Sequence, residues 1–262
     1  MSRTFVLSVS FAFLALLGAA TINCGGSSSS GGGNGGGPFD VVGDWQLVFS
    51  SNVGDTAFAF GAINSSGLGA FLDFSGNIVT LPKVTGVKSF SGNLTAYAVN
   101  PNFFSNGTPL ETDPAQGNVN SATSITGTFT SGTNPAGTFA AGPYFAITGA
   151  PVALSGAMNG KELGFVNTLL LTFNSNGTFS GGDNFGCSVG GTIAQEKSSD
   201  VFDVTFSNVS GACTTDTRTG IAFESKTDFF NVNAGADATY FYMILLTSQL
   251  TNVRPGVIVI YQ

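Results

Sequence analysis

The chain has 262 residues, only 9% of them charged, and carries a net charge of −7. It contains no histidine, which excludes Ser-His-Asp and Cys-His catalysis and all histidine-based metal sites. The acidic balance argues against binding to nucleic acid or to anionic lipid surfaces. The 25 phenylalanines supply apolar surface for a packed core. We therefore expect a folded, non-enzymatic protein without metal or other cofactor.

The chain begins with a hydrophobic leader. Arg3 supplies a positive charge, Phe5 to Ala20 is an uncharged apolar run, and Gly25 follows Cys24, which is typical of an export signal. The arrangement resembles the lipobox leader of bacterial lipoproteins. This resemblance implies a signal peptide over 1–23, lipid on Cys24 and anchorage in the outer membrane, on its periplasmic or surface face.

Two alternatives remain for this leader. Ordinary signal peptidase could cut near residues 18–20 and leave a secreted protein. A retained transmembrane helix fits less well, because spanning a bilayer takes about 20 apolar residues. After the leader, residues 24–38 are expected to form the lipidated cysteine and a flexible Gly/Ser linker. The folded domain is expected over 39–262.

Strand signals dominate this domain, and helical periodicity is almost absent. Alternating apolar residues and hairpin successions predict an antiparallel all-β fold, either a β-barrel or a β-sandwich. The expected strands lie at 45–49, 58–61, 70–74, 78–81, 90–99, 125–130, 138–140, 144–148, 169–173, 178–179, 186–194, 201–207, 220–224, 229–232, 240–246 and 257–261.

Three features concern the organisation of the domain. Residues 67–81 loosely echo residues 165–181, which suggests two similar lobes with a boundary near 156–163. The segment 100–122 contains three prolines and is expected to be a mobile surface loop or an inter-lobe connection. The run 240–246 is apolar on both faces, so we expect a central strand that is covered on each side.

The cysteine count is odd, which needs an explanation in an exported protein. If Cys24 carries lipid, Cys187 and Cys213 remain as one disulfide pair in an oxidising compartment. Closing their loop of about 25 residues would stabilise the fold by roughly 3.5 kcal/mol. The alternative is two buried free thiols, and a zinc site does not fit two sulfurs without histidine.

Two patterns could carry enzymatic chemistry. Ser188 stands in a G-x-S-x-G pattern, but the segment is a predicted strand and no histidine base exists, so we expect no catalytic residue there. A glycosidase needs only two carboxyl groups about 5–10 Å apart. The candidate pairs are Asp40 with Asp44, Asp200 with Asp203, and Glu224 with Asp228.

Trp45 is the only tryptophan and stands in Gly43-Asp44-Trp45. This triplet resembles the G-x-W opening of lipocalin-type barrels, which implies a tryptophan that plugs the closed end of a ligand-binding barrel. The alternative is an ordinary core tryptophan on a first strand. Trp45 is therefore a weak candidate for ligand binding.

The segments 186–193, 200–205, 211–213 and 220–223 are similar to the C-terminal region of uncharacterised Gly/Ser/Thr-rich bacterial lipoproteins. The resemblance implies a β-rich export domain with a cysteine pair and no established activity. We expect a lipid-anchored cell-envelope protein that binds an unknown envelope protein, glycan or small apolar ligand through its loops, with 100–122 as the best candidate surface. The alternatives are a lipocalin-like carrier of a small apolar ligand and a carboxylate-based glycan-active protein.

Overall fold

The computed structural model describes residues 39–52, 54, 56–85, 88–98, 108–130, 136–144, 154–163, 168–196, 199–210, 216–230, 232, 239–246 and 256–261. The chain divides into the units Met1–Gly36 and Gly37–Gln262, and every described residue belongs to the second. Within the described residues all regular structure is β, and the strands form two closed antiparallel barrels. This confirms the predicted all-β fold with two similar lobes and decides for a barrel over a sandwich.

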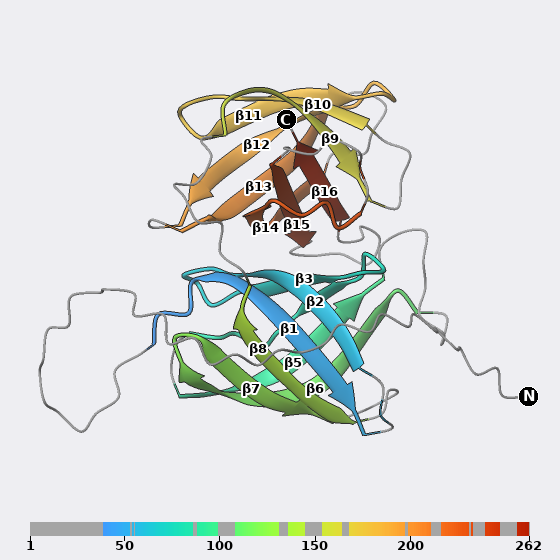
Figure 1. The fold of residues 1–262 in the computed structure, drawn as a ribbon. Coiled ribbons are helices and arrows are strands. Elements are labelled where there is room, and N and C mark those ends of the chain that lie inside the picture. Colours follow the sequence, from blue (N-terminus) through green and yellow to red (C-terminus); the bar gives the residue numbers. More distant parts are fainter. Residues whose placement is uncertain are drawn as a thin grey trace, which may run out of the picture. The chain divides into compact units, whose positions relative to one another are not determined.

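Each barrel contains eight strands in up-and-down order, its last strand pairing with its first (Figure 1). The N-barrel consists of β1 (Gly43–Ser51), β2 (Thr56–Ile63), β3 (Gly69–Asp73), β4 (Ile78–Thr80), β5 (Ser89–Tyr97), β6 (Leu110–Ser121), β7 (Ser124–Phe129) and β8 (Gly137–Pro143). The C-barrel consists of β9 (Gly156–Glu162), β10 (Thr168–Phe173), β11 (Thr178–Asp183), β12 (Ser188–Gln195), β13 (Val201–Ser210), β14 (Asp216–Ser225), β15 (Tyr240–Leu246) and β16 (Gly256–Tyr261).

The two barrels share their strand register as well as their strand order. Starting from Trp45 on β1, the successive cross-strand partners up to β6 are Gly61, Phe71, Val79, Ala96 and Glu111. Starting from Met158 on β9, the successive partners up to β14 are Leu171, Gly181, Val189, Asn208 and Asp216. From β6 back to β1, the partners in the N-barrel are Gly117, Gly127, Phe139 and Phe49. From β14 back to β9, the equivalent partners in the C-barrel are Ala222, Met243, Ile258 and Glu162. Each paired position on these two paths therefore has a defined equivalent in the other barrel.

The turns between the second and third strands show the same repetition. The segment 64–68 reads Asn-Ser-Ser-Gly-Leu and 174–178 reads Asn-Ser-Asn-Gly-Thr. In both turns the glycine lies at positive φ, +82° at Gly67 and +78° at Gly177, a conformation that favours glycine. In both turns its N–H donates to the carbonyl of the first asparagine, at 2.9 and 3.0 Å.

The next turn repeats as well, nine residues further along each half. The Oδ1 atom of Asp73 accepts N–H bonds from Ser75 and Asn77, and that of Asp183 accepts them from Phe185 and Cys187. Such aspartate-centred turns are a common local structure. The structural repeat thus aligns 64–77 with 174–187, so β3 corresponds to β11 and β4 to β12. The predicted echo between 67–81 and 165–181 matched β3 with β10 and was therefore wrong by one strand.

Each barrel has its own apolar interior, filled by the inward residue of each alternating pair. The N-barrel interior includes Trp45, Leu47, Phe71, Phe90, Ile125 and Phe139, and the C-barrel interior includes Leu171, Phe179, Phe206, Phe241 and Met243. Filled interiors of this kind are expected for barrels of eight strands.

A third apolar core joins the outer faces of the two barrels. Phe60 on β2 stacks on Phe229, with ring centroids 3.5 Å apart, and meets Tyr242 on β15 edge-on at 5.6 Å. The Tyr242 hydroxyl donates to the carbonyl of Thr227 at 2.8 Å. Because β15 faces the C-barrel interior on one side and this core on the other, nearly all of Tyr240–Leu246 is buried. The predicted double-sided burial of this strand is confirmed.

Several sequence predictions need correction. Leu110–Ser121 forms β6, so the prediction of a loop over 100–122 was wrong for that part, and 99–107 lie outside the described residues. The predicted strand over 229–232 was also wrong, since Phe229 and Phe230 lie in a turn after β14. The predicted boundary range 156–163 is occupied by β9, and the chain changes barrels between Pro143 and Gly156. The leader, Cys24 and the linker lie outside the described residues.

Candidate functional site

A cavity of about 310 Å³ lies at one end of the N-barrel. It opens where β1, β5 and β7 end and where β6 begins. Its apolar lining consists of Phe49, Ala57, Val79, Leu94, Ala96 and Phe129. Most of these side chains belong to the N-barrel core or pack against it. The core is therefore closed at its centre and hollow at this end.

Two carboxylates from the beginning of β6 form the polar part of this cavity. Glu111 and Asp113 alternate with Thr112, so their side chains share the inward face of the strand. Asp113 is only 5% exposed, and Glu111 is half-buried. The described residues that line the cavity include no lysine or arginine. The cavity thus combines an apolar wall with a negative side.

Two aromatic rings beside these acids pack against each other. Phe49 and Phe129 meet edge to face, with ring centroids 6.2 Å apart and an interplanar angle of 75°. Edge-to-face pairs of this kind are favoured by the quadrupoles of the two rings. The cavity wall is therefore a preformed aromatic surface.

Trp45 lies elsewhere, near the other end of β1 from Phe49 and Ser51. Its side chain is 2% exposed, and its Nε1 donates to the carbonyl of Val41 at 2.9 Å. The side chain therefore fills the N-barrel interior and closes it, and Trp45 is not among the residues that line the cavity. On the same strand, Phe49 and Ser51 line the cavity in its place.

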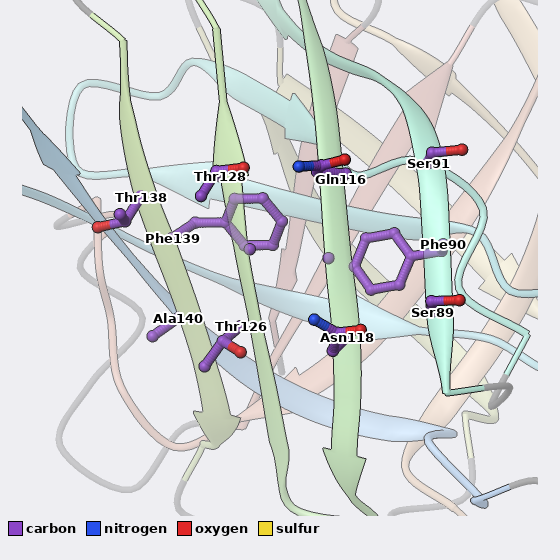
Figure 2. A pocket seen from close by; sticks show the side chains of 12 residues that line it. Ser89, Phe90, Ser91, Gln116, Asn118, Thr126, Thr128, Thr138, Phe139 and Ala140 are labelled. Atoms are coloured by element: carbon purple, nitrogen blue, oxygen red, sulfur yellow. The ribbon is translucent and has the colours of Figure 1, made fainter.

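A second depression, of about 900 Å³, lies on the outer face of β5–β8 (Figure 2). Its base is a row of four paired residues in which Phe90 and Phe139 flank Gly117 and Gly127. A Cβ atom on Gly127 would lie 2.2 Å from Cζ of Phe139, so the inward-facing ring takes the space over the glycine. The outward side chains around the row are Ser89, Ser91, Gln116, Asn118, Thr126, Thr128, Thr138 and Ala140. This face offers neutral hydrogen-bonding groups and no charge among its described lining residues.

The structure brings together carboxylates from all three candidate glycosidase pairs in a combination that the sequence did not predict. Asp44 at the start of β1 interacts with Asp200, to which it is hydrogen-bonded, and with Glu224 on β14. Burial, reinforced by these two carboxylates, raises the pKa of Asp44 to about 9. Asp44 is therefore neutral at pH 7.

These acids lie in a buried contact between the barrels rather than in a cleft. Asp44 is 9% exposed and Glu224 is 1% exposed. Neither Asp44, Asp200 nor Glu224 lines the barrel-end cavity or the outer depression. A glycosidase needs carboxyl groups on both sides of a bound sugar, so this geometry favours a contact that depends on protonation.

A neighbouring polar contact also joins the two barrels. The Asn64 side chain donates to Asp203 at 2.6 Å, and the Ser65 hydroxyl donates to Glu196 at 2.9 Å. Burial and the nearby Asp203 raise the pKa of Glu196. The remaining candidate acids have local roles, since Asp40 accepts the N–H of Val42 and Asp228 that of Val232.

The cysteine pair is tested only in part by the described residues. Cys187 is 3% exposed and precedes β12, and Cys213 lies outside the described residues. Ser188 begins β12 and faces Ser210, the last residue of β13, so it lies on a strand and not on a catalytic turn. Because Cys213 lies outside the described residues, the Cys187–Cys213 bond stays a prediction.

The described residues offer neither a metal site nor a membrane-spanning helix. They contain no group of three or more acids and cysteines arranged to hold a metal ion. No helix among them is long and apolar enough to span a membrane. No known protein family, curated protein or solved structure matches this chain. Its function must therefore be argued from its own geometry.

Proposed function

We propose that this chain is a non-enzymatic, lipid-anchored protein of the bacterial cell envelope that binds a small apolar ligand at the open end of its N-barrel. The observation that carries the binding proposal is the cavity of about 310 Å³ bounded by Phe49, Leu94 and Phe129. Cavities for small molecules are concave, mostly apolar and supplied with a few polar groups. This cavity meets each condition, with Asp113 and Glu111 as the polar groups.

The barrel architecture supports the same proposal. An eight-stranded barrel is just wide enough to hold its own side chains or one small ligand. The N-barrel is filled by its own side chains around Trp45 and leaves room for a small ligand near Phe49. Placement in the envelope rests on the leader and on Cys24, so it is tested separately, by the intact mass of protein purified from its native membrane. Lipid attached to Cys24 supports the anchor, and a mature mass without lipid overturns it.

The binding proposal is tested with the neutral apolar fluorophore N-phenyl-1-naphthylamine. We expect saturable binding by the purified full-length protein. Ala96→Trp places a large side chain in the cavity and should weaken binding at least tenfold. Ala194→Trp is the matched control, since Ala194 lies on the exposed outer face of β12 in the C-barrel and should leave binding unchanged.

Thermal unfolding of both variants establishes that each is folded. If wild-type protein shows no saturable binding, or if both tryptophan variants bind as wild type does, the cavity is not the ligand site and the proposal fails.

The outer depression supports a second candidate, binding of a neutral glycan. Its size of about 900 Å³ and its ring of hydroxyl and amide groups suit a ligand that is itself rich in hydroxyl groups. Isothermal titration with neutral oligosaccharides tests this, and the Thr128→Lys variant should abolish any binding by placing a long charged side chain in the depression. Binding that survives Thr128→Lys contradicts this assignment.

A further inference from the structure

The equal registers of the two barrels allow their ends to be compared residue by residue. The barrel-end cavity of the N-barrel is bounded by Phe49 on β1 and by Glu111 and Asp113 on β6. The register places Glu162 of β9 at the position of Phe49, because each residue faces an equivalent residue of the closing strand. The register also places Asp216 at the position of Glu111, and hence Arg218 at that of Asp113.

At this end the C-barrel contains an internal ion network. The Nε atom of Arg218 lies 2.7 Å from Oδ2 of Asp216, and its Nη1 atom lies 3.6 Å from Oε1 of Glu162. All three side chains are mostly buried, with 15–17% of their surface exposed. The guanidinium extends across the barrel, because a Cβ atom on Gly256 of β16 would lie 2.7 Å from Nη1 of Arg218. At this end of the C-barrel, the cationic guanidinium of Arg218 is therefore held between two carboxylates.

The N-barrel keeps the acidic part of this arrangement and replaces the rest. Glu111 is the equivalent of Asp216, and Asp113 is the equivalent of Arg218. The aromatic ring of Phe49 is the equivalent of the Glu162 carboxylate. The described lining of the cavity holds two carboxylates and no basic side chain. Aromatic rings next to carboxylates form a favourable environment for an organic cation, which is attracted to both.

We propose that the ligand of the N-barrel is an amphipathic organic cation, whose ammonium or guanidinium group lies near Asp113 and Glu111, where the C-barrel holds the guanidinium of Arg218. Its apolar body lies against Phe49, Phe129 and Leu94. This inference rests on the proposed function, since it names the ligand class of the same cavity. Asp113 lies with Glu111 on the inward face of β6, beside the aromatic wall of the cavity, so its attraction to a cation sets the charge preference.

Three probes of nearly equal shape and different charge test the inference: 2-phenylethylamine, 2-phenylethanol and 3-phenylpropionate. Isothermal titration of the full-length protein should show the amine binding at least tenfold more tightly than the alcohol, and the carboxylate binding least. Asp113→Asn should bring the amine and the alcohol within about twofold of each other. Asp183→Asn is the matched control, since Asp183 lies in the β11–β12 turn of the C-barrel, and it should preserve the preference.

A second variant imitates the C-barrel. Asp113→Arg places a guanidinium beside Glu111 and should abolish amine binding while the thermal unfolding transition stays cooperative. If the alcohol and the carboxylate bind wild type as tightly as the amine does, the cation inference is overturned and the apolar cavity stands. If Asp113→Asn keeps the full preference for the amine, the inference also fails. If none of the three probes binds while N-phenyl-1-naphthylamine does, the cation inference fails and the proposed function stands; if none of the four binds, both fail.

Discussion

The buried carboxyl group of Asp44 makes the stability of the protein depend on pH in a direction opposite to that of an ordinary salt-bridged acid. Its pKa is about 9 in the folded state, against a usual value of 3.8. Below about pH 4 the group is protonated in both the folded and the unfolded chain, so its contribution to stability is complete. As the pH rises towards 9, the unfolded chain loses this proton while the folded chain keeps it, and stability falls.

The magnitude follows from a difference of one proton. Each pH unit between the two pKa values costs about 1.4 kcal/mol of stability, so the loss from pH 5 to pH 7 is about 2.7 kcal/mol. For a domain of this size that corresponds to a fall in Tm of roughly 5–11 °C. Asp73 and Glu196, whose pKa values burial also raises, add to the wild-type slope with the same sign.

The Asp44→Asn variant isolates the contribution of this one group. Its free energy of unfolding, measured by urea denaturation at pH 5, 6 and 7, should gain about 2.7 kcal/mol relative to wild type across this range. Asp40→Asn is the control, because Asp40 is exposed and its replacement should leave the wild-type slope unchanged. If Asp44→Asn and wild type have parallel stability curves, Asp44 is not protonated in the folded state and the account of this contact is wrong.

Three further predictions concern packing and the cysteine pair. Phe60→Ala should lower stability by about 3–5 kcal/mol, measured by urea denaturation, because Phe60 is at the centre of the core between the barrels; a loss below 1 kcal/mol contradicts this packing. Gly127→Ala should cost about 1–3 kcal/mol, since its Cβ would lie 2.5 Å from the carbonyl oxygen of Gln116; an unchanged Tm argues against the close approach. Reduction should add two hydrogens to the intact mass and lower stability by about 3.5 kcal/mol; Cys187→Ser without loss of stability argues against a bond to Cys213.

The segment over β6 shows why part of the candidate site could not be predicted from the sequence. Its inward positions hold Glu111, Asp113, Ala115, Gly117 and Val119, so carboxylates and a glycine stand where a strand pattern requires large apolar residues. The alternation was therefore hidden, and the prolines favoured a loop. The same residues, Glu111 and Asp113, form the negative side of the cavity. Sequence patterns are expected to fail at functional or strained sites, which is why this segment is a candidate.

The sequence by itself determined the local structure of this protein. Alternating apolar residues predicted strands, Asn-Ser-Asn-Gly at 174–177 predicted a tight turn, and the apolar run 240–246 predicted a strand covered on both faces, because these signals lie within a few residues of one another. Only the tertiary structure decided that the strands close into two barrels of equal register. It also brought Asp44 next to Glu224, and it showed that Arg218 is the counterpart of Asp113. These relations join residues about 100 or more positions apart, and they depend on strand closure and packing, which no local pattern encodes.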